Sequence, residues 1–69
     1  MLDVKRLNIF REVVSQGSFS AAADALDYSQ SAVSQAIQTL EGEAGVTLIE
    51  RSRGGVRPTA AGAALAGHV

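Results

Sequence analysis

The sequence predicts a small, mostly α-helical domain with a short β-hairpin near its end. Three observations carry this prediction. Apolar residues recur at helical spacing up to about residue 44, turn residues separate the periodic stretches, and a β-branched run then precedes a Gly-Gly turn. The second and third predicted helices are joined by only three or four residues. The expected order is a three-helix core, a two-stranded wing and the start of a further helix, which is a winged helix-turn-helix.

Length and composition limit what the chain can be. A 69-residue chain forms one small domain that buries about 60% of its unfolded surface. The absence of cysteine excludes disulfides and thiolate metal sites, and the sequence contains no secretory signal pattern and no apolar stretch of membrane-spanning length. We therefore expect a cytoplasmic domain without a membrane partner.

The net charge of −1 by itself argues against a nucleic-acid binder, because phosphate neutralisation dominates such affinity. The charges are unevenly distributed, however. Residues 1–50 contain three basic and seven acidic side chains, whereas residues 51–69 contain three arginines and no acid. A local basic edge of this kind can still steer and hold DNA.

The first two predicted helices have recognisable ends. Asp3 is a candidate cap for a helix that runs to Gln16 and ends at Gly17, and Ser18 is the candidate cap of the next helix. The first helix has two apolar strips, and the second has a small buried face rich in alanine. The residues expected to face inward are Leu7, Ile9, Phe10, Val13, Val14, Phe19, Ala22, Ala23 and Leu26.

The third predicted helix, at about residues 29–44, has two chemically different faces. Ser29 or its neighbour caps it, and Gly45 ends it. The apolar face consists of Val33, Ala36, Ile37, Leu40 and Ala44. The opposite face consists of Ser31, Ser34, Gln35 and Gln38. One face therefore suits the core and the other suits a partner.

The segment after this helix predicts a hairpin. Residues 46–51 form its first strand, residues 52–55 its turn, and Val56 with Arg57 its second strand, which Pro58 ends. Thr59 then caps a last, weakly apolar helix. These boundaries assign residues 1–58 to the winged domain and residues 59–69 to the start of the next element.

The polar surfaces of this arrangement suit DNA. Glutamine in a major groove can bond adenine N6 and N7, and serine can bond several base edges, which favours Gln30, Ser34 and Gln35 as base contacts. Contacts to the backbone or minor groove are expected from Ser29, Gln38, Arg51, Arg53 and Arg57.

Other readings of these residues remain open. Arg51 could instead form an ion pair with Glu43 or Glu50, and Gln38 and Arg57 could be solvated surface. Lys5 and Arg6 are expected to be ordinary surface residues, and the alternative for them is a contact to the flanking DNA backbone. A winged helix used only for protein contacts is the alternative function.

The sequence offers little material for catalysis. It has one histidine, no cysteine and no clustered carboxylates, so it contains no nucleophile–base pair and no set of metal ligands. We therefore expect neither enzyme activity nor a cofactor in this domain.

One string in the third helix is specific: Ser-Gln-x-Ala-Val-Ser-x-x-Ile-x-x-Leu-Glu, from Ser29 to Glu41. Supporting matches cover nearly the whole chain, at Leu7, Asn8, Ile9, Phe10, residues 17–23, Leu26, Leu48, Arg51 and residues 59–62. On these residues the chain resembles the N-terminal DNA-binding domain of LysR-type transcriptional regulators of bacteria. The chain departs from that pattern at Ser31, where many members have proline, at Gln35, where a basic residue is frequent, and at Gly54, where the wing arginine often stands.

The resemblance implies that Gln30, Ser31, Ser34 and Gln35 face the DNA major groove and that the wing carries an arginine. It also implies that residues 59–69 begin a linker helix that pairs two subunits and leads to an effector-binding domain absent from this sequence. The implied partners are double-stranded DNA with an interrupted inverted repeat and further copies in a homodimer or tetramer of the full-length protein. A small-molecule effector is expected only for the missing domain.

Overall fold

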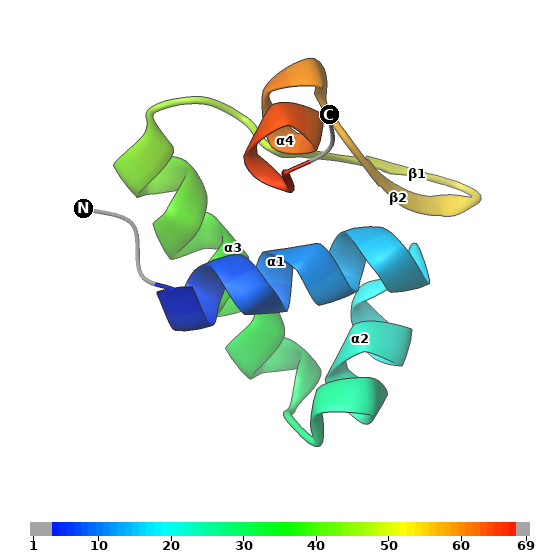
Figure 1. The fold of residues 1–69 in the computed structure, drawn as a ribbon. Helices are drawn as coiled ribbons and strands as arrows, with labels where there is room; N and C mark the ends of the chain where they lie inside the picture. Colours follow the sequence, from blue (N-terminus) through cyan, green and yellow to red (C-terminus); the bar gives the residue numbers. More distant parts are fainter. Residues whose placement is uncertain (1–3, 68–69) are drawn as a thin grey trace.

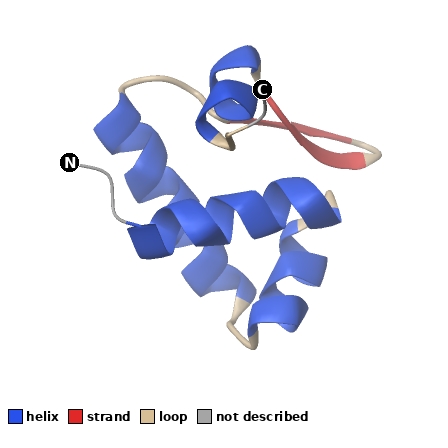
Figure 2. Cartoon of the chain, viewed as in Figure 1, coloured by secondary structure: helices blue, strands red, loops and turns tan. Residues whose placement is uncertain are grey.

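The computed structural model of the chain describes residues 4–67. Within them the chain forms four helices and one antiparallel hairpin in the expected order (Figures 1 and 2). The elements are α1 (Val4–Gln16), α2 (Phe19–Leu26), α3 (Gln30–Ala44), β1 (Ile49–Ser52), β2 (Gly55–Pro58) and α4 (Ala60–Leu65). The predicted winged helix-turn-helix is therefore confirmed. None of the helices in this range is long and apolar enough to cross a membrane.

Side-chain hydrogen bonds begin three of the helices at the predicted residues. In each case a hydroxyl oxygen accepts a hydrogen bond from a backbone N–H of the first turn, which would otherwise be unpaired. The pairs are Ser18 with Ala21, Ser29 with Ala32 and Thr59 with Gly62, each at 3.1 Å. The predicted cap at Asp3 lies outside the described residues.

The core lies where α1, α2 and α3 meet, and the hairpin and α4 cover it on the upper side in Figure 1. Its largest fully buried side chains are Phe10, Leu40, Leu48, Val13 and Val33. The predicted inward face of α3 is confirmed except at Ala44, which is exposed. The buried residues of α3 end at Leu40, so the last turn projects beyond the part of the helix that packs.

The hairpin is shorter at its beginning than the sequence predicts. β1 and β2 pair from Ile49 with Pro58 to Ser52 with Gly55, which leaves Arg53 and Gly54 as the turn. The predicted strand start at Val46 is wrong, and so is the four-residue turn. Beyond Ile49, Thr59 N–H still donates to the carbonyl oxygen of Leu48 at 3.0 Å, but the N–H groups of Leu48 and Ile49 donate to the side chain of Glu41 instead of to the second strand.

Two glycines let the wing and α4 lie close to the rest of the domain. Val56 N–H donates to the carbonyl oxygen of Gly17 at 3.0 Å, and a Cβ on Gly55 would overlap that oxygen. A Cβ on Gly62 would likewise overlap the carbonyl oxygen of Leu48. The absence of a side chain at these two positions therefore fixes how near β2 comes to the α1–α2 turn and how near α4 comes to the start of the wing.

Candidate nucleic-acid interface

The face of α3 opposite the core is a polar stripe, consisting of Ser31, Ser34, Gln35 and Gln38. Ser34 is half-buried and the other three are exposed. Residues three and four apart share one side of a helix, so the four side chains form a continuous surface. Gln30 is exposed beside its beginning. The structure thus brings together the four residues predicted to contact bases.

A groove, which we call the wing groove, runs along one side of this stripe. It is bounded by the start of α2, the first half of α3 and the hairpin. The side chains in it that can bond to a polyanion or a base are Ser18, Ser20, Gln30, Ser31, Ser34, Arg51 and Ser52. The groove therefore joins predicted base contacts to one predicted backbone contact, and it adds Ser20 and Ser52, which the sequence patterns did not indicate.

Arg51 is held in the wing groove by an aromatic ring. Its Cζ atom lies 4.5 Å from the centroid of the Phe19 ring at the start of α2. The face of a ring attracts a cation, and a planar guanidinium can stack in this way while its N–H edge remains oriented for hydrogen bonding. The alternative ion pairs are not formed among the described residues. Glu43 lies 3.6 Å from Arg6, and Glu50 is on the other face of the hairpin.

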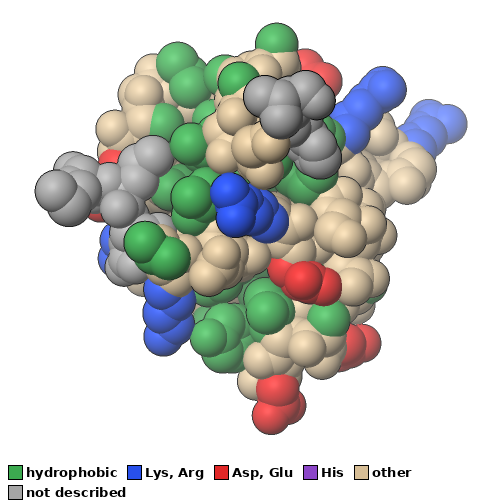
Figure 3. Space-filling view, in the orientation of Figure 1, with side chains coloured by type: hydrophobic (Ala, Val, Ile, Leu, Met, Phe, Trp, Pro, Cys, Tyr) green, Lys and Arg blue, Asp and Glu red, His purple; other side chains and the backbone are tan. Residues whose placement is uncertain are grey.

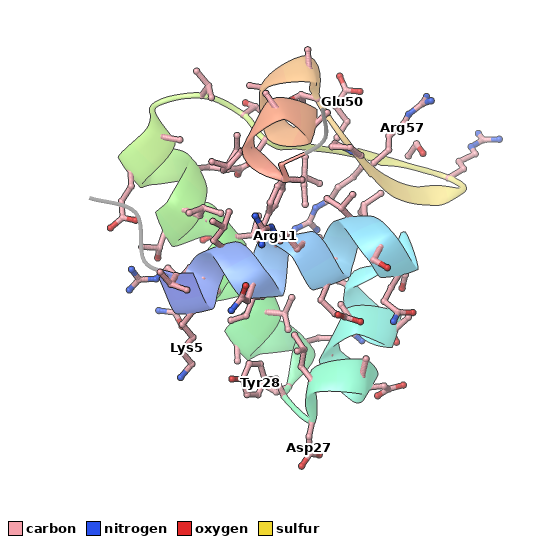
Figure 4. The ribbon with its side chains drawn as sticks, viewed as in Figure 1. Lys5, Arg11, Asp27, Tyr28, Glu50 and Arg57 are labelled. Atoms are coloured by element: carbon pink, nitrogen blue, oxygen red, sulfur yellow. The ribbon has the colours of Figure 1, made fainter. Side chains whose placement is uncertain are left out.

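The three wing arginines point in different directions. Arg53 lies at the exposed turn. Side chains alternate along a strand, so Arg51 shares one face with Val56, whereas Arg57 shares the other face with its cross-strand partner Glu50. Figure 4 shows Glu50 and Arg57 on the side of the hairpin that faces away from α1. Only Arg51 of the three lines the wing groove.

A second groove, which we call the α1 groove, lies on the other side of the polar stripe. Its polar lining comprises Lys5 and Arg6 of α1, Tyr28 of the turn, and Gln35 and Thr39 of α3. Lys5 and Arg6, which the sequence predicts to be ordinary surface residues or contacts to the flanking DNA backbone, line this groove. No sequence pattern places these cations beside α3, because their position depends on how α1 packs across α3.

The remaining predicted contacts lie near the two ends of the stripe. Ser29 Oγ accepts a hydrogen bond from Ala32 N at 3.1 Å, and its own O–H hydrogen can be donated to a second group. Gln38 is exposed about one turn beyond Gln35. Both residues are exposed, Ser29 at the N-cap of α3 and Gln38 within the helix.

Glu41 is a structural residue for which the sequence predicts no role. Its Oε2 atom accepts hydrogen bonds from the backbone N–H groups of Leu48, at 2.8 Å, and Ile49, at 3.2 Å. Because Glu41 belongs to α3 and Ile49 begins β1, these bonds set the position of the wing relative to the polar stripe. The partners are seven and eight residues apart and follow no helical spacing, so the sequence offers no signal for this contact.

The charge beside α3 differs from the charge of the whole chain. Glu41 is bonded to the wing, Glu43 lies near Arg6, and Glu50 is on the far face of the hairpin. No described residue lining either groove is acidic. Figure 3 shows Lys and Arg side chains projecting at the hairpin end and beside the start of α1. Between residues 4 and 67 no three potential ligands cluster to hold a metal ion.

The chain matches a family model and several curated proteins. The family model, described as bacterial regulatory helix-turn-helix protein of the lysR family, matches residues 4–63. The chain is 54% identical over 61 residues to the probable HTH-type transcriptional regulator LrrA of Synechococcus elongatus, covering 88% of this chain and 21% of LrrA. The chain thus spans about a fifth of the length of that relative.

The structure is also similar to domains solved with DNA. The protein in the CbnR_DBD–DNA complex is 38% identical in sequence to this chain, and the two structures superpose with a TM-score of 0.89. The match covers 94% of this chain and 75% of the CbnR_DBD chain. For the protein in the BenM_DBD/benA site 1 DNA complex the sequence identity is 39% and the TM-score is 0.88. This match covers 94% of this chain and 73% of the BenM_DBD chain. The family match over most of its length, together with these similarities, shows that the chain belongs to the lysR family of bacterial regulatory helix-turn-helix proteins.

Proposed function

We propose that this chain is the sequence-specific DNA-binding domain of a bacterial lysR-family transcription regulator, with α3 in the major groove and the wing on the backbone or minor groove. The observation that carries the proposal is the division of α3 into a buried apolar face and an exposed, uncharged polar stripe. The similarity to two domains solved with DNA supports it. A regulatory rather than an enzymatic role is part of the same proposal.

In this proposal four side chains read the bases. Gln30, Ser31, Ser34 and Gln35 lie in the first turns of α3, where a helix entering a major groove brings side chains to base edges. An amide can donate to and accept from adenine at once, and a hydroxyl can do either with several bases. Uncharged groups of this kind discriminate between bases without binding every phosphate equally.

The backbone contacts come from both ends of the stripe and from the wing. Ser29 and Gln38 reach phosphates beside the groove, and Arg51 does so from the wing groove. Arg53, at the hairpin tip, extends toward a phosphate or an adjacent minor groove. We assign Arg57 the smallest part, because it lies on the far face of the hairpin.

Membership of the family supports a proposal for the larger protein. Residues 59–69 would begin a linker helix that pairs two subunits, after a DNA-binding domain that ends at residue 58. Two such domains in a homodimer or tetramer would bind an interrupted inverted repeat, and an effector would bind a separate domain. A regulator of this kind would act in the cytoplasm, where bacterial DNA is accessible.

The proposal is tested by selecting bound duplexes from a random DNA pool with the 69-residue chain. We expect a shared half-site motif, and in gel shifts we expect the selected duplex to be retained at moderate salt when a scrambled duplex is released. A pool without a shared motif, or no retained DNA at low salt, would refute sequence-specific binding. The second result would instead favour the use of this winged helix for protein contacts.

A further inference from the structure

We propose that Phe19 positions Arg51 for a phosphodiester of the DNA backbone, with the wing groove as the binding site of that phosphate. This inference deepens the proposed function and rests on it, because it concerns how one backbone contact is made while α3 occupies the major groove. Phe19 is a positioning residue, which acts through the arginine.

The first step is the charge available on this flank of α3. Residues 30–40 contain no charged side chain, so this part of α3 offers no cation to a phosphate. Arg51 is the one basic residue among the described residues that line the wing groove, and none of them is acidic. A helix with its side chains is about 10–12 Å across and the major groove of B-DNA is about 12 Å wide, so a sugar–phosphate strand passes along this flank. The backbone contact in the groove therefore depends on one guanidinium.

The second step is the position of the aromatic ring. Phe19 is half-buried and packs against the core, directly after Ser18, whose hydroxyl caps α2. The position of the ring is therefore set by the packing of the helices. The Arg51 Cζ atom lies 4.5 Å from the ring centroid, although Arg51 as a whole is exposed. The ring thus provides a fixed surface for a side chain that would otherwise extend into solvent.

The third step is the attachment of the hairpin next to this ring. Val56, the cross-strand partner of Arg51, donates its N–H to the carbonyl oxygen of Gly17 at 3.0 Å. Gly17 lies shortly before Phe19 in the chain, so one turn both anchors the strand pair and supplies the ring. Gly55 permits this approach, because a Cβ there would overlap the Gly17 oxygen. The backbone and the guanidinium of Arg51 are thus both held relative to the α1–α2 turn.

The consequence is an arginine that is ordered before DNA binds. A long side chain that becomes immobilised only in the complex loses conformational entropy, and this loss weakens binding. Stacking on a ring restricts the planar guanidinium in advance and leaves its N–H edge able to donate to a phosphate oxygen. The ring of Phe19 should therefore contribute to DNA affinity only while Arg51 is present.

The experiment is a double-mutant cycle, measured on the selected duplex. Phe19→Leu keeps an apolar side chain against the core but removes the ring, and Phe19→Tyr retains the ring. Phe19→Leu is combined with Arg51→Gln and, as the matched control, with Arg57→Gln, which removes the same charge from the far face of the hairpin. Thermal melts establish that each variant is folded at the assay temperature, and Phe19→Met replaces Phe19→Leu if the latter is not.

We expect Arg51→Gln to reduce the magnitude of the slope of log K against log salt by about 0.9, the value for one phosphate contact. Phe19→Leu should weaken binding by about two- to tenfold, the effect of ordering one long side chain. Phe19→Tyr should bind like the unsubstituted chain. The loss caused by Phe19→Leu should disappear in the Arg51→Gln background and persist in the Arg57→Gln background, because only residues that act together are non-additive.

Three results would overturn the inference. Phe19→Leu could bind as well as the unsubstituted chain, its loss could be equal in the two arginine backgrounds, or Arg51→Gln could leave the salt slope unchanged. Equal losses would assign Phe19 a role in the core alone. If Gln35→Ala still relaxes base preference in any of these cases, the proposed function stands while the positioning role of Phe19 falls. If the unsubstituted chain retains no duplex, both proposals fail.

Discussion

The carboxylate of Glu41 in α3 accepts a hydrogen bond from the backbone N–H of Leu48 at 2.8 Å, directly before the wing begins. The same oxygen accepts from Ile49 at 3.2 Å. One side chain of α3, the helix proposed to read bases, thus accepts hydrogen bonds from two N–H groups of the protein backbone at the start of the wing. The wing is the element proposed to contact the DNA backbone. Wing and helix are therefore fixed to one another by a contact that does not involve the hairpin's own ladder.

Replacing Glu41 by Ala should lower the free energy of unfolding by about 1–3 kcal/mol, because two partly buried N–H groups lose a charged acceptor. Glu41→Gln retains a carbonyl oxygen and should lose less. The control is Glu43→Ala in the same helix, where a surface pair with Arg6 is worth at most about 1 kcal/mol. Urea denaturation measures all three, and equal losses for Glu41→Ala and Glu43→Ala would contradict the assigned role.

Two glycine-to-alanine substitutions should change stability in opposite directions. Gly62→Ala places a Cβ against the carbonyl oxygen of Leu48 and the ring of Phe10, so α4 must move and stability should fall by about 1–3 kcal/mol. Gly42→Ala meets no atom within 4 Å and removes a flexible residue from α3, so stability should rise by about 0.5–1 kcal/mol. Thermal melts of the two variants decide this, and a stabilised Gly62→Ala protein would show that α4 is not held as described.

Gln35→Ala should relax base preference at one position of the selected motif at a loss of about 1–3 kcal/mol in binding to the preferred sequence. The amide is exposed on the polar stripe and its removal leaves the core intact. Gln16→Ala, an exposed glutamine at the end of α1, is the matched control. Binding to duplexes that vary one base pair at a time measures the effect. Unchanged preference at every base pair would remove Gln35 from the set of base contacts.

Arg53→Ala should weaken binding to all sequences alike and reduce the salt dependence, because a tip arginine contacts the backbone or a minor groove rather than major-groove base edges. Arg57→Ala removes the same charge from the far face of the hairpin and should have a clearly smaller effect. Salt titrations of both variants on selected and scrambled duplexes make the comparison. A larger effect for Arg57 would mean that the DNA passes the other face of the wing.

The elements with local causes could be predicted from the sequence. Ser18, Ser29 and Thr59 each bond to an N–H three residues ahead, and Gly45 ends α3 with a positive φ of 75°. The apolar repeat of α3 likewise indicates which side is buried, because helical geometry relates near neighbours. The same repeat also assigned Ala44 to the core, which is wrong because periodicity does not show where packing ends.

By itself the sequence determined the three-helix core, the wing and the uncharged face of α3, since each depends on residues within a few positions of one another. The tertiary structure alone decided the rest. Arg51 lies over Phe19, Glu41 bonds to Leu48 and Ile49, and Lys5 lies beside Tyr28. Each of these contacts joins different elements, so its geometry depends on how whole helices and the hairpin pack, which no local spacing in the chain specifies.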